Sequence, residues 1–166
     1  MRILQKIVSA LNRFFIFVAA VALILMMFLG FGNVLFRTVW KPIEGTYELI
    51  GYLGAVTTAL ALGYAQIRKS HISVDIITSH YSKPWQKITN GINYLVTAVF
   101  FALAAWQTEV WGTNVWHTGE RSETLRIIFF PFVYVVALGF AFLAFILILD
   151  FFSLFKKEPP SSLENL

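Results

Sequence analysis

The chain has 166 residues, of which 58% are hydrophobic and 13% charged, and its formal net charge is +4. This balance is far from that of a soluble domain and indicates one small integral membrane domain. Its positive residues lie at the ends of apolar stretches, not in a cluster with exposed aromatic residues, so membrane topology explains them better than nucleic-acid binding. The lack of cysteine excludes disulfides, iron–sulfur clusters and thiol nucleophiles.

The first predicted element is an amphipathic helix over residues 1–13, because apolar side chains fall on one helical face and polar ones on the other. Such a helix lies at the membrane interface. The charge-free stretch 14–36 follows and is 23 residues long. A signal peptide also begins with a basic region, but its apolar core is only about 7–15 residues. We therefore interpret 14–36 as an uncleaved first span.

The second predicted span is the charge-free run 49–67, which follows a short connector, 37–48. The run is 19 residues long, close to the roughly 20 residues that cross a bilayer as a helix. Glu48 lies at one end and Arg68 at the other. The run is rich in small residues such as Gly54 and Gly63, which predicts a helix that packs closely against a neighbour.

Two further spans complete a single membrane domain over residues 1–157. A short interfacial helix is expected over 72–81, before the third span at 88–108, and the fourth span covers 127–149. Residues 158–166 are interpreted as a disordered tail. The final residues Leu163–Leu166 resemble the start of an engineered protease site and carry no functional interpretation.

Four spans place both termini on one side of the membrane. That side carries nine Lys or Arg residues, whereas the two opposite connectors, 37–48 and 109–126, carry four. The positive-inside rule therefore predicts cytoplasmic termini. Tryptophans flank the spans and are interpreted as interfacial anchors: Trp40, Trp85, Trp111 and Trp116. The five-residue spacing of Trp106, Trp111 and Trp116 scatters them around a helix, which favours an aromatic belt over a ligand cage.

The sequence offers no evident reaction centre. All three histidines fall in connectors, so none is placed as a haem ligand inside a bundle. No pair of His, Asp or Glu has a spacing typical of a metal site. A small proton-coupled multidrug exporter, the alternative class, needs an ionisable residue within a span, and the four charge-free runs contain none. The residues therefore indicate a subunit of a larger membrane assembly, with no catalytic, cofactor or metal residues.

The stretch 48–75 also carries a family motif. An acid, Glu48, opens the second span, Gly54 lies in a Leu-Gly-Ala step, and a string with Arg68, His71 and Asp75 follows the span. This arrangement resembles the small, DctQ-type membrane subunit of tripartite ATP-independent periplasmic (TRAP) transporters. The chain departs from the family pattern at Tyr47, where many members carry a second acid, and at Gly51, where many carry arginine.

The resemblance implies a scaffold subunit of the bacterial inner membrane. A soluble periplasmic protein would capture an organic acid anion, such as a sialic acid or a C4-dicarboxylate, and a large membrane subunit would move it with a sodium gradient. This chain would anchor the large subunit, in contact with membrane lipids. The motif residues would have an architectural role, Asp75 capping a helix end or pairing with Arg68 or His71. Direct contact with a partner subunit is the alternative interpretation.

The outward connectors carry the charges expected to meet the periplasmic binding protein. Such a contact is transient and polar, so complementary charge steers it. The candidate docking residues are Arg37, Lys41, Glu44, Glu120, Arg121 and Glu123. Ordinary solvated interfacial charges are the alternative interpretation of each one.

Overall fold

The computed structural model describes residues 2–68 and 83–155. Within these ranges the chain forms four helices: α1 (Arg2–Val39), α2 (Thr46–Ile67), α4 (Lys83–Thr118) and α5 (Phe130–Phe155). Each of the four is long and apolar enough to cross a membrane. The prediction of an all-α membrane protein with four spans is confirmed.

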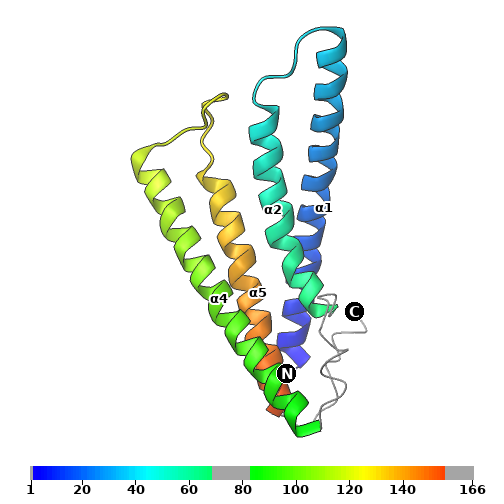
Figure 1. Ribbon diagram of the computed structural model, residues 1–166, viewed down its shortest axis with the longest axis vertical. Helices are drawn as coiled ribbons and strands as arrows, with labels where there is room; N and C mark the ends of the chain where they lie inside the picture. Colours follow the sequence, from blue (N-terminus) through cyan, green and yellow to red (C-terminus); the bar gives the residue numbers. More distant parts are fainter. Residues whose placement is uncertain (1, 69–82, 156–166) are drawn as a thin grey trace.

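The helices form two antiparallel hairpins that pack side by side (Figure 1). α1 and α2 form the first hairpin, α4 and α5 the second, and α2 packs on α5 to join them. We call the end that carries residues 40–45 and 119–129 the connector end. The opposite end, where α1 and α4 begin and α2 and α5 finish, is the terminal end.

The helices extend beyond the predicted spans. The prediction of a separate interfacial helix over residues 1–13 is wrong, because α1 runs without a break from Arg2 to Val39. No glycine or proline lies between residues 2 and 29 to interrupt it. A helix satisfies its own backbone hydrogen bonds in water as well as in lipid, so a change from polar to apolar sequence does not end it.

The second hairpin shows the same effect. We expected a connector from residue 109 to 126, but α4 continues to Thr118 and is followed by Gly119 at a φ of +65°. α5 begins at Phe130, slightly later than predicted, with Pro131 in its first turn, where a missing N–H has no cost. The predicted helix 72–81 and tail 158–166 lie outside the described residues.

α5 has the largest buried share of the four helices, and the core forms around it. Its Phe142 and Ile146 pack with Val56 and Leu60 of α2 and with Phe15 of α1. A second cluster joins Leu143 and Leu147 to Ala98 of α4. Side chains from three helices therefore meet on α5.

Small residues allow α2 and α5 to approach closely. A Cβ atom on Gly139 of α5 would lie 2.7 Å from the backbone carbonyl carbon and oxygen of Ala59. A Cβ atom on Gly63 of α2 would lie 2.8 Å from the ring of Phe142. The two helix backbones touch at this crossing, which is typical of helix packing in lipid.

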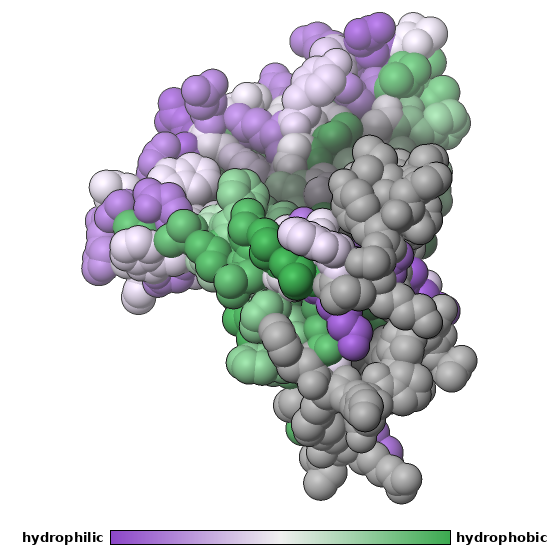
Figure 2. Space-filling view, turned by 60° about the horizontal axis from the view of Figure 1, so that its bottom comes forward, coloured by the Kyte–Doolittle hydropathy of each residue, from purple (hydrophilic) through white to green (hydrophobic). Residues whose placement is uncertain are grey.

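The outer helices α1 and α4 expose wide apolar faces. Phe17 and Phe28 of α1 are 66% and 70% exposed, and Phe100 of α4 is 64% exposed. Figure 2 shows hydrophobic side chains across the middle of one face, with many hydrophilic ones toward the connector end. A band of this kind belongs in contact with lipid or with another membrane subunit.

Candidate functional site

The connector end is fastened by the carboxylate of Glu48. This residue lies in the first turn of α2, and its two oxygens accept the backbone N–H groups of Thr124 at 2.7 Å and Leu125 at 3.2 Å. Backbone N–H groups bonded to a carboxylate form charge-assisted hydrogen bonds, which are stronger than neutral ones. Glu48 thus joins the start of α2 to the connector of the other hairpin.

Leu125 makes the same junction from the other side. Gly45, the residue before α2, has a φ of +71°, a conformation that favours glycine. The Leu125 side chain fills the space that a Cβ atom on Gly45 would occupy. Gly45 is therefore required both by the backbone turn and by the packing of Leu125.

The two connectors are themselves held by internal hydrogen bonds. The amide oxygen of buried Asn33 accepts the N–H of Ile43 at 2.9 Å, and the hydroxyl of Thr46 donates to the Ile43 carbonyl at 2.7 Å. In the other connector, the N–H of Ser122 donates to the Ile127 carbonyl at 3.0 Å. Both connectors are thus ordered turns that present fixed surfaces.

Tyr52 extends the junction one turn further along α2. Its ring stacks on Phe129 and on Phe132, with centroid distances of 5.6 Å and 5.3 Å. Because Glu48 and Tyr52 are four residues apart, they lie on the same face of the helix. That face fastens α2 to the second hairpin by hydrogen bonds and by aromatic packing.

A second polar contact joins α2 and α5 at the terminal end. The amide nitrogen of Gln66, a buried residue, donates to a carboxylate oxygen of Asp150 at 2.9 Å. The α2–α5 pair is therefore fixed at both ends and in close backbone contact between them. We call this pair the spine.

The remaining predicted motif residues are only partly within the described chain. Gly54 faces α1, where a Cβ atom would lie 3.6 Å from the sulfur of Met26. Arg68 follows α2, and its guanidinium lies 5.6 Å from the Tyr64 ring centroid. His71 and Asp75, with the predicted pairing of Asp75, lie outside the described residues.

The candidate docking residues gather at the connector end. Arg37 lies in the last turn of α1, and all six of the set are exposed: Arg37, Lys41, Glu44, Glu120, Arg121 and Glu123. Glu48, by contrast, has its carboxylate bonded to the second connector. The six charges lie on both hairpins at one end of the molecule. Their role in docking stays a prediction.

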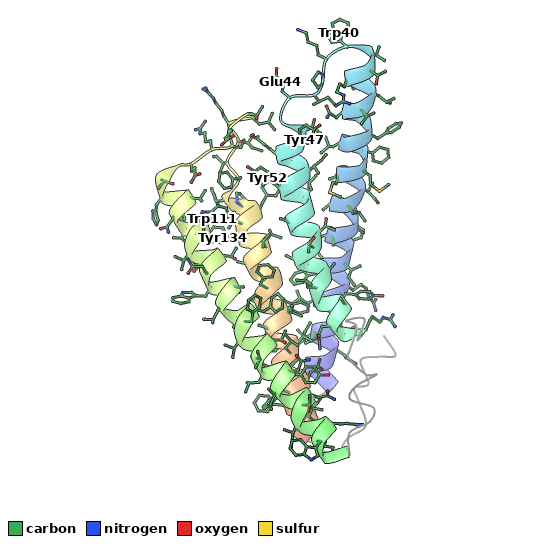
Figure 3. The ribbon with its side chains drawn as sticks, viewed as in Figure 1. Trp40, Glu44, Tyr47, Tyr52, Trp111 and Tyr134 are labelled. Carbon is green, nitrogen blue, oxygen red and sulfur yellow. The ribbon has the colours of Figure 1, made fainter. Side chains whose placement is uncertain are left out.

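The four candidate anchors are exposed and lie toward both ends of the molecule. Trp40 is 80% exposed and lies at the extreme end of the first hairpin, beyond the level of Tyr52, Trp111 and Tyr134 (Figure 3). Trp85 is 64% exposed and lies in the first turn of α4, at the terminal end. Trp111 and Trp116, on α4, contact Phe129 and Phe130 of the second hairpin.

Sequence reasoning missed two residues of the spine. Gln66 is an amide within an apolar run, and Gly139 is a small residue within the fourth run. Both signals were visible, but neither identifies a partner, because Asp150 and Ala59 lie far away in the chain. Within the described residues no group of three His, Cys, Asp or Glu side chains is placed to hold a metal ion.

Comparison with protein families decides the assignment. A family model described as tripartite ATP-independent periplasmic transporters, DctQ component, matches residues 26–157. The chain belongs to the DctQ family. A DctQ component is the small membrane subunit of a tripartite transporter that also contains a large subunit and a binding protein.

The DctQ assignment agrees with the resemblance found in the sequence, and it identifies the chain as a multi-pass membrane protein. Searches of curated proteins and of solved structures gave no match. The spine and both connectors of this DctQ protein lie within the matched region.

Proposed function

We propose that this DctQ protein is the non-catalytic scaffold of a sodium-coupled, binding-protein-dependent transporter for organic acid anions in the bacterial inner membrane. It anchors the large transport subunit and helps to dock the periplasmic binding protein. The observation that carries the proposal is the spine, which is fixed by Glu48 at one end and by Gln66 at the other. A moving transport domain needs such a fixed neighbour.

The charge distribution supports a scaffold over a stand-alone transporter. The runs 14–36, 49–67, 88–108 and 127–149 contain no Asp, Glu, Lys, Arg or His. Proton coupling within a membrane uses ionisable residues within a span. The substrate and sodium sites would then belong to the large subunit.

The exposed apolar faces support the anchoring role. The wide apolar surfaces on α1 and α4 are available for a membrane partner as well as for lipid. The glycines of α2 contribute less to such a contact than the sequence suggested, since Gly54 and Gly63 already face α1 and α5 of the same chain. The neighbours of these two glycines are therefore helices of the same chain.

The connector end supports the docking role. Five of its six exposed charges lie on the ordered connectors and Arg37 lies in the last turn of α1, and charges of both signs suit a contact that forms and dissociates repeatedly. With cytoplasmic termini, as the charge count predicts, this end faces the periplasm. The substrate is a sialic acid or a C4-dicarboxylate, as the family resemblance implies.

Reconstitution tests the proposal. Liposomes containing both membrane subunits, with binding protein outside and an inward sodium gradient, should take up sialic acid or a C4-dicarboxylate. Liposomes with this chain alone should take up neither substrate. Liposomes with the large subunit alone should take up substrate more slowly than those with both subunits. Flux of substrate or protons driven by this chain alone contradicts the scaffold role.

A further inference from the structure

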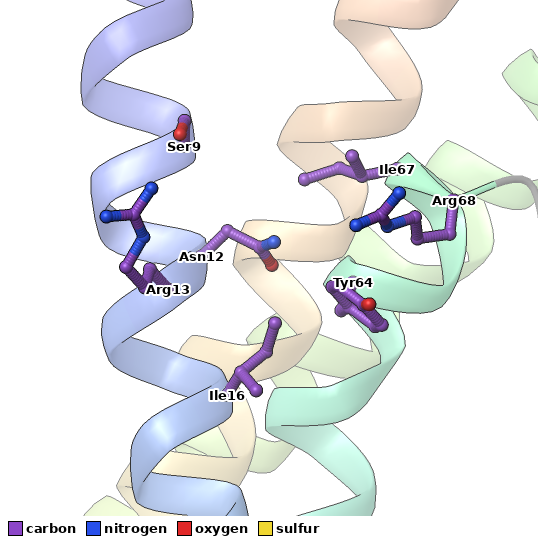
Figure 4. Close-up of a pocket in the computed structure, with 7 residues that line it drawn as sticks. All are labelled: Ser9, Asn12, Arg13, Ile16, Tyr64, Ile67 and Arg68. Atoms are coloured by element: carbon purple, nitrogen blue, oxygen red, sulfur yellow. The ribbon is translucent and has the colours of Figure 1, made fainter. Parts of the chain in front are cut away.

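A polar pocket lies between α1 and α2 at the terminal end of the first hairpin. It has a volume of about 220 Å³ and is lined by Ser9, Asn12, Arg13, Ile16, Tyr64, Ile67 and Arg68 (Figure 4). One ordered water needs only about 10–15 Å³ of such space. Neither the spine nor the candidate docking charges account for this pocket.

Asn12 points into the pocket without a partner for its oxygen. The residue is 7% exposed, and its Oδ1 atom has no hydrogen-bond partner. Figure 4 shows the amide directed from α1 toward the gap between the two helices. A buried acceptor without a partner has a free-energy cost of about 1–3 kcal/mol. A ligand that supplies a hydrogen-bond donor at this point removes the cost.

Two guanidinium groups border the same space. Arg13 comes from α1 and Arg68 follows α2, and both are exposed. Within the described part of the chain neither forms an ion pair, and Arg68 lies instead over the Tyr64 ring. Guanidinium groups bind phosphate oxygens through paired, charge-assisted hydrogen bonds. The pocket thus combines sites for a phosphate with an acceptor for a donor group.

The depth of the pocket favours a lipid as the source of that phosphate. Arg13 directly precedes the charge-free run 14–36, and Arg68 directly follows the run 49–67. Both guanidinium groups therefore lie at the level of the phospholipid headgroups on one side of the membrane. Ile16 and Ile67 line the pocket next to them and offer apolar contact to the start of an acyl chain.

We propose that this pocket binds a phosphate ester that also carries a hydrogen-bond donor, as in the headgroup of phosphatidylglycerol. Arg13 and Arg68 donate to the phosphate oxygens, and a headgroup hydroxyl donates to Oδ1 of Asn12. Two cations favour an anionic headgroup over a zwitterionic one. Four lining residues, Ser9, Asn12, Arg13 and Ile16, precede the region 26–157 that matches the family.

Short-chain lipids test the site in the full-length chain in detergent. Four probes are titrated while the thermal unfolding midpoint is followed, because a ligand that binds the folded state raises it. The probes are dioctanoyl forms of phosphatidylglycerol, phosphatidylmethanol and phosphatidylcholine, together with glycerol 1-phosphate. Phosphatidylmethanol is anionic but has no headgroup donor. We expect phosphatidylglycerol to bind about fivefold more tightly than phosphatidylmethanol, and phosphatidylcholine to cause no saturable shift.

The glycerol 1-phosphate arm identifies the source of the phosphate. A weak or absent response to this probe shows that the acyl chains contribute, as a lipid site requires. A response equal to that of phosphatidylglycerol assigns the pocket to a free phosphate ester, with the same residues bound to it. Equal, unsaturable shifts with all four probes overturn the proposal.

Variants separate the two halves of the site. Arg13→Gln and Arg68→Gln should each weaken phosphatidylglycerol binding about tenfold. Lys87→Gln, which removes an exposed cation of α4 outside the pocket, should leave it unchanged. Asn12→Leu should keep anion binding but remove the preference for phosphatidylglycerol over phosphatidylmethanol. A preference that survives Asn12→Leu, or arginine variants that behave like Lys87→Gln, would refute the assignment.

Discussion

The carboxylate of Glu48 accepts the backbone N–H of Thr124 at 2.7 Å, across 76 residues of sequence. This contact joins the two hairpins at the connector end, which also carries the six exposed docking charges. Because the bond is to the backbone, the sequence of the connector can change while the contact persists. The contact does, however, require the carboxylate of Glu48 on α2.

Replacement of Glu48 should release the connector 119–129. In Glu48→Ala the N–H groups of Thr124 and Leu125 lose their acceptors, so their hydrogen exchange should accelerate. Glu48→Gln keeps one acceptor oxygen and should have an intermediate effect. Glu44→Gln, at an exposed position of the other connector, serves as the matched control. Unchanged exchange at residues 124 and 125 in Glu48→Ala would show that the connector is held by packing alone.

Gly139→Ala should separate α2 from α5. The added Cβ atom would lie 2.7 Å from the backbone of Ala59, so the helices must move apart. Overpacking of this kind lowers the free energy of unfolding by about 1–3 kcal/mol, which denaturant titration in mixed micelles measures. Gly51→Ala is the control, because nothing lies within 4 Å of its new Cβ atom.

A second substitution sharpens this prediction. Ala59→Gly should fail to rescue Gly139→Ala, since the closest atoms belong to the Ala59 backbone. Full rescue would mean that the helices meet through the Ala59 side chain only.

Loss of Gln66 should loosen the terminal end of the spine. Gln66→Leu removes the amide that donates to Asp150 at 2.9 Å. A hydrogen bond to a charged group contributes about 1.5–3 kcal/mol, so the free energy of unfolding should fall by about that amount. Gln107→Leu, an exposed glutamine of α4, controls for the change in polarity. Equal free energies of unfolding in the two variants would show that this contact does not stabilise the spine.

The positive-inside count predicts the orientation of the hairpins. A reporter fused after Lys157 should indicate the cytoplasm, whereas one inserted at Gly119 should indicate the periplasm. Gly119 suits an insertion, because it is exposed and nothing lies within 4 Å of a Cβ atom placed there. Reversed signals at both sites would overturn the orientation and the docking surface with it, while the four helices would stand.

Reversal of the basic docking charges should slow productive docking. The triple variant Arg37→Glu, Lys41→Glu and Arg121→Glu should lower uptake in liposomes at low salt, and less so at moderate salt, because ions screen exposed charges. The same three residues changed to Gln should give an intermediate loss. Copurification with the large subunit checks that assembly is intact. Wild-type uptake by the Glu variant at every concentration of binding protein would exclude this surface.

The sequence predicted the number of spans, because a charge-free run of about 20 residues has few alternatives. It did not predict where the helices end. α1 includes the amphipathic segment 1–13, and α4 includes residues 109–118, since helices continue until a residue such as Gly119 favours another backbone conformation.

Residues of the site could be predicted from the sequence, but the contacts that they make could not. Glu48 was identified from its place before the second span, but its partners are backbone groups, which carry no residue-specific signal. Gly54 and Gly63 were expected to pack against a helix, and they do so within the chain itself. A single sequence contains no information on which pairs of distant residues meet.

The long sequence separation between Glu48 and Thr124 also determines when their contact can form during synthesis of the protein. When α2 leaves the ribosome, the connector that will bond to its carboxylate has not yet been synthesised. Until the connector is made, the carboxylate of Glu48 lacks its two backbone partners, and no Leu125 side chain is present to pack on Gly45. Closure of the connector end is thus a late step, and it takes place only in chains whose second hairpin has been inserted.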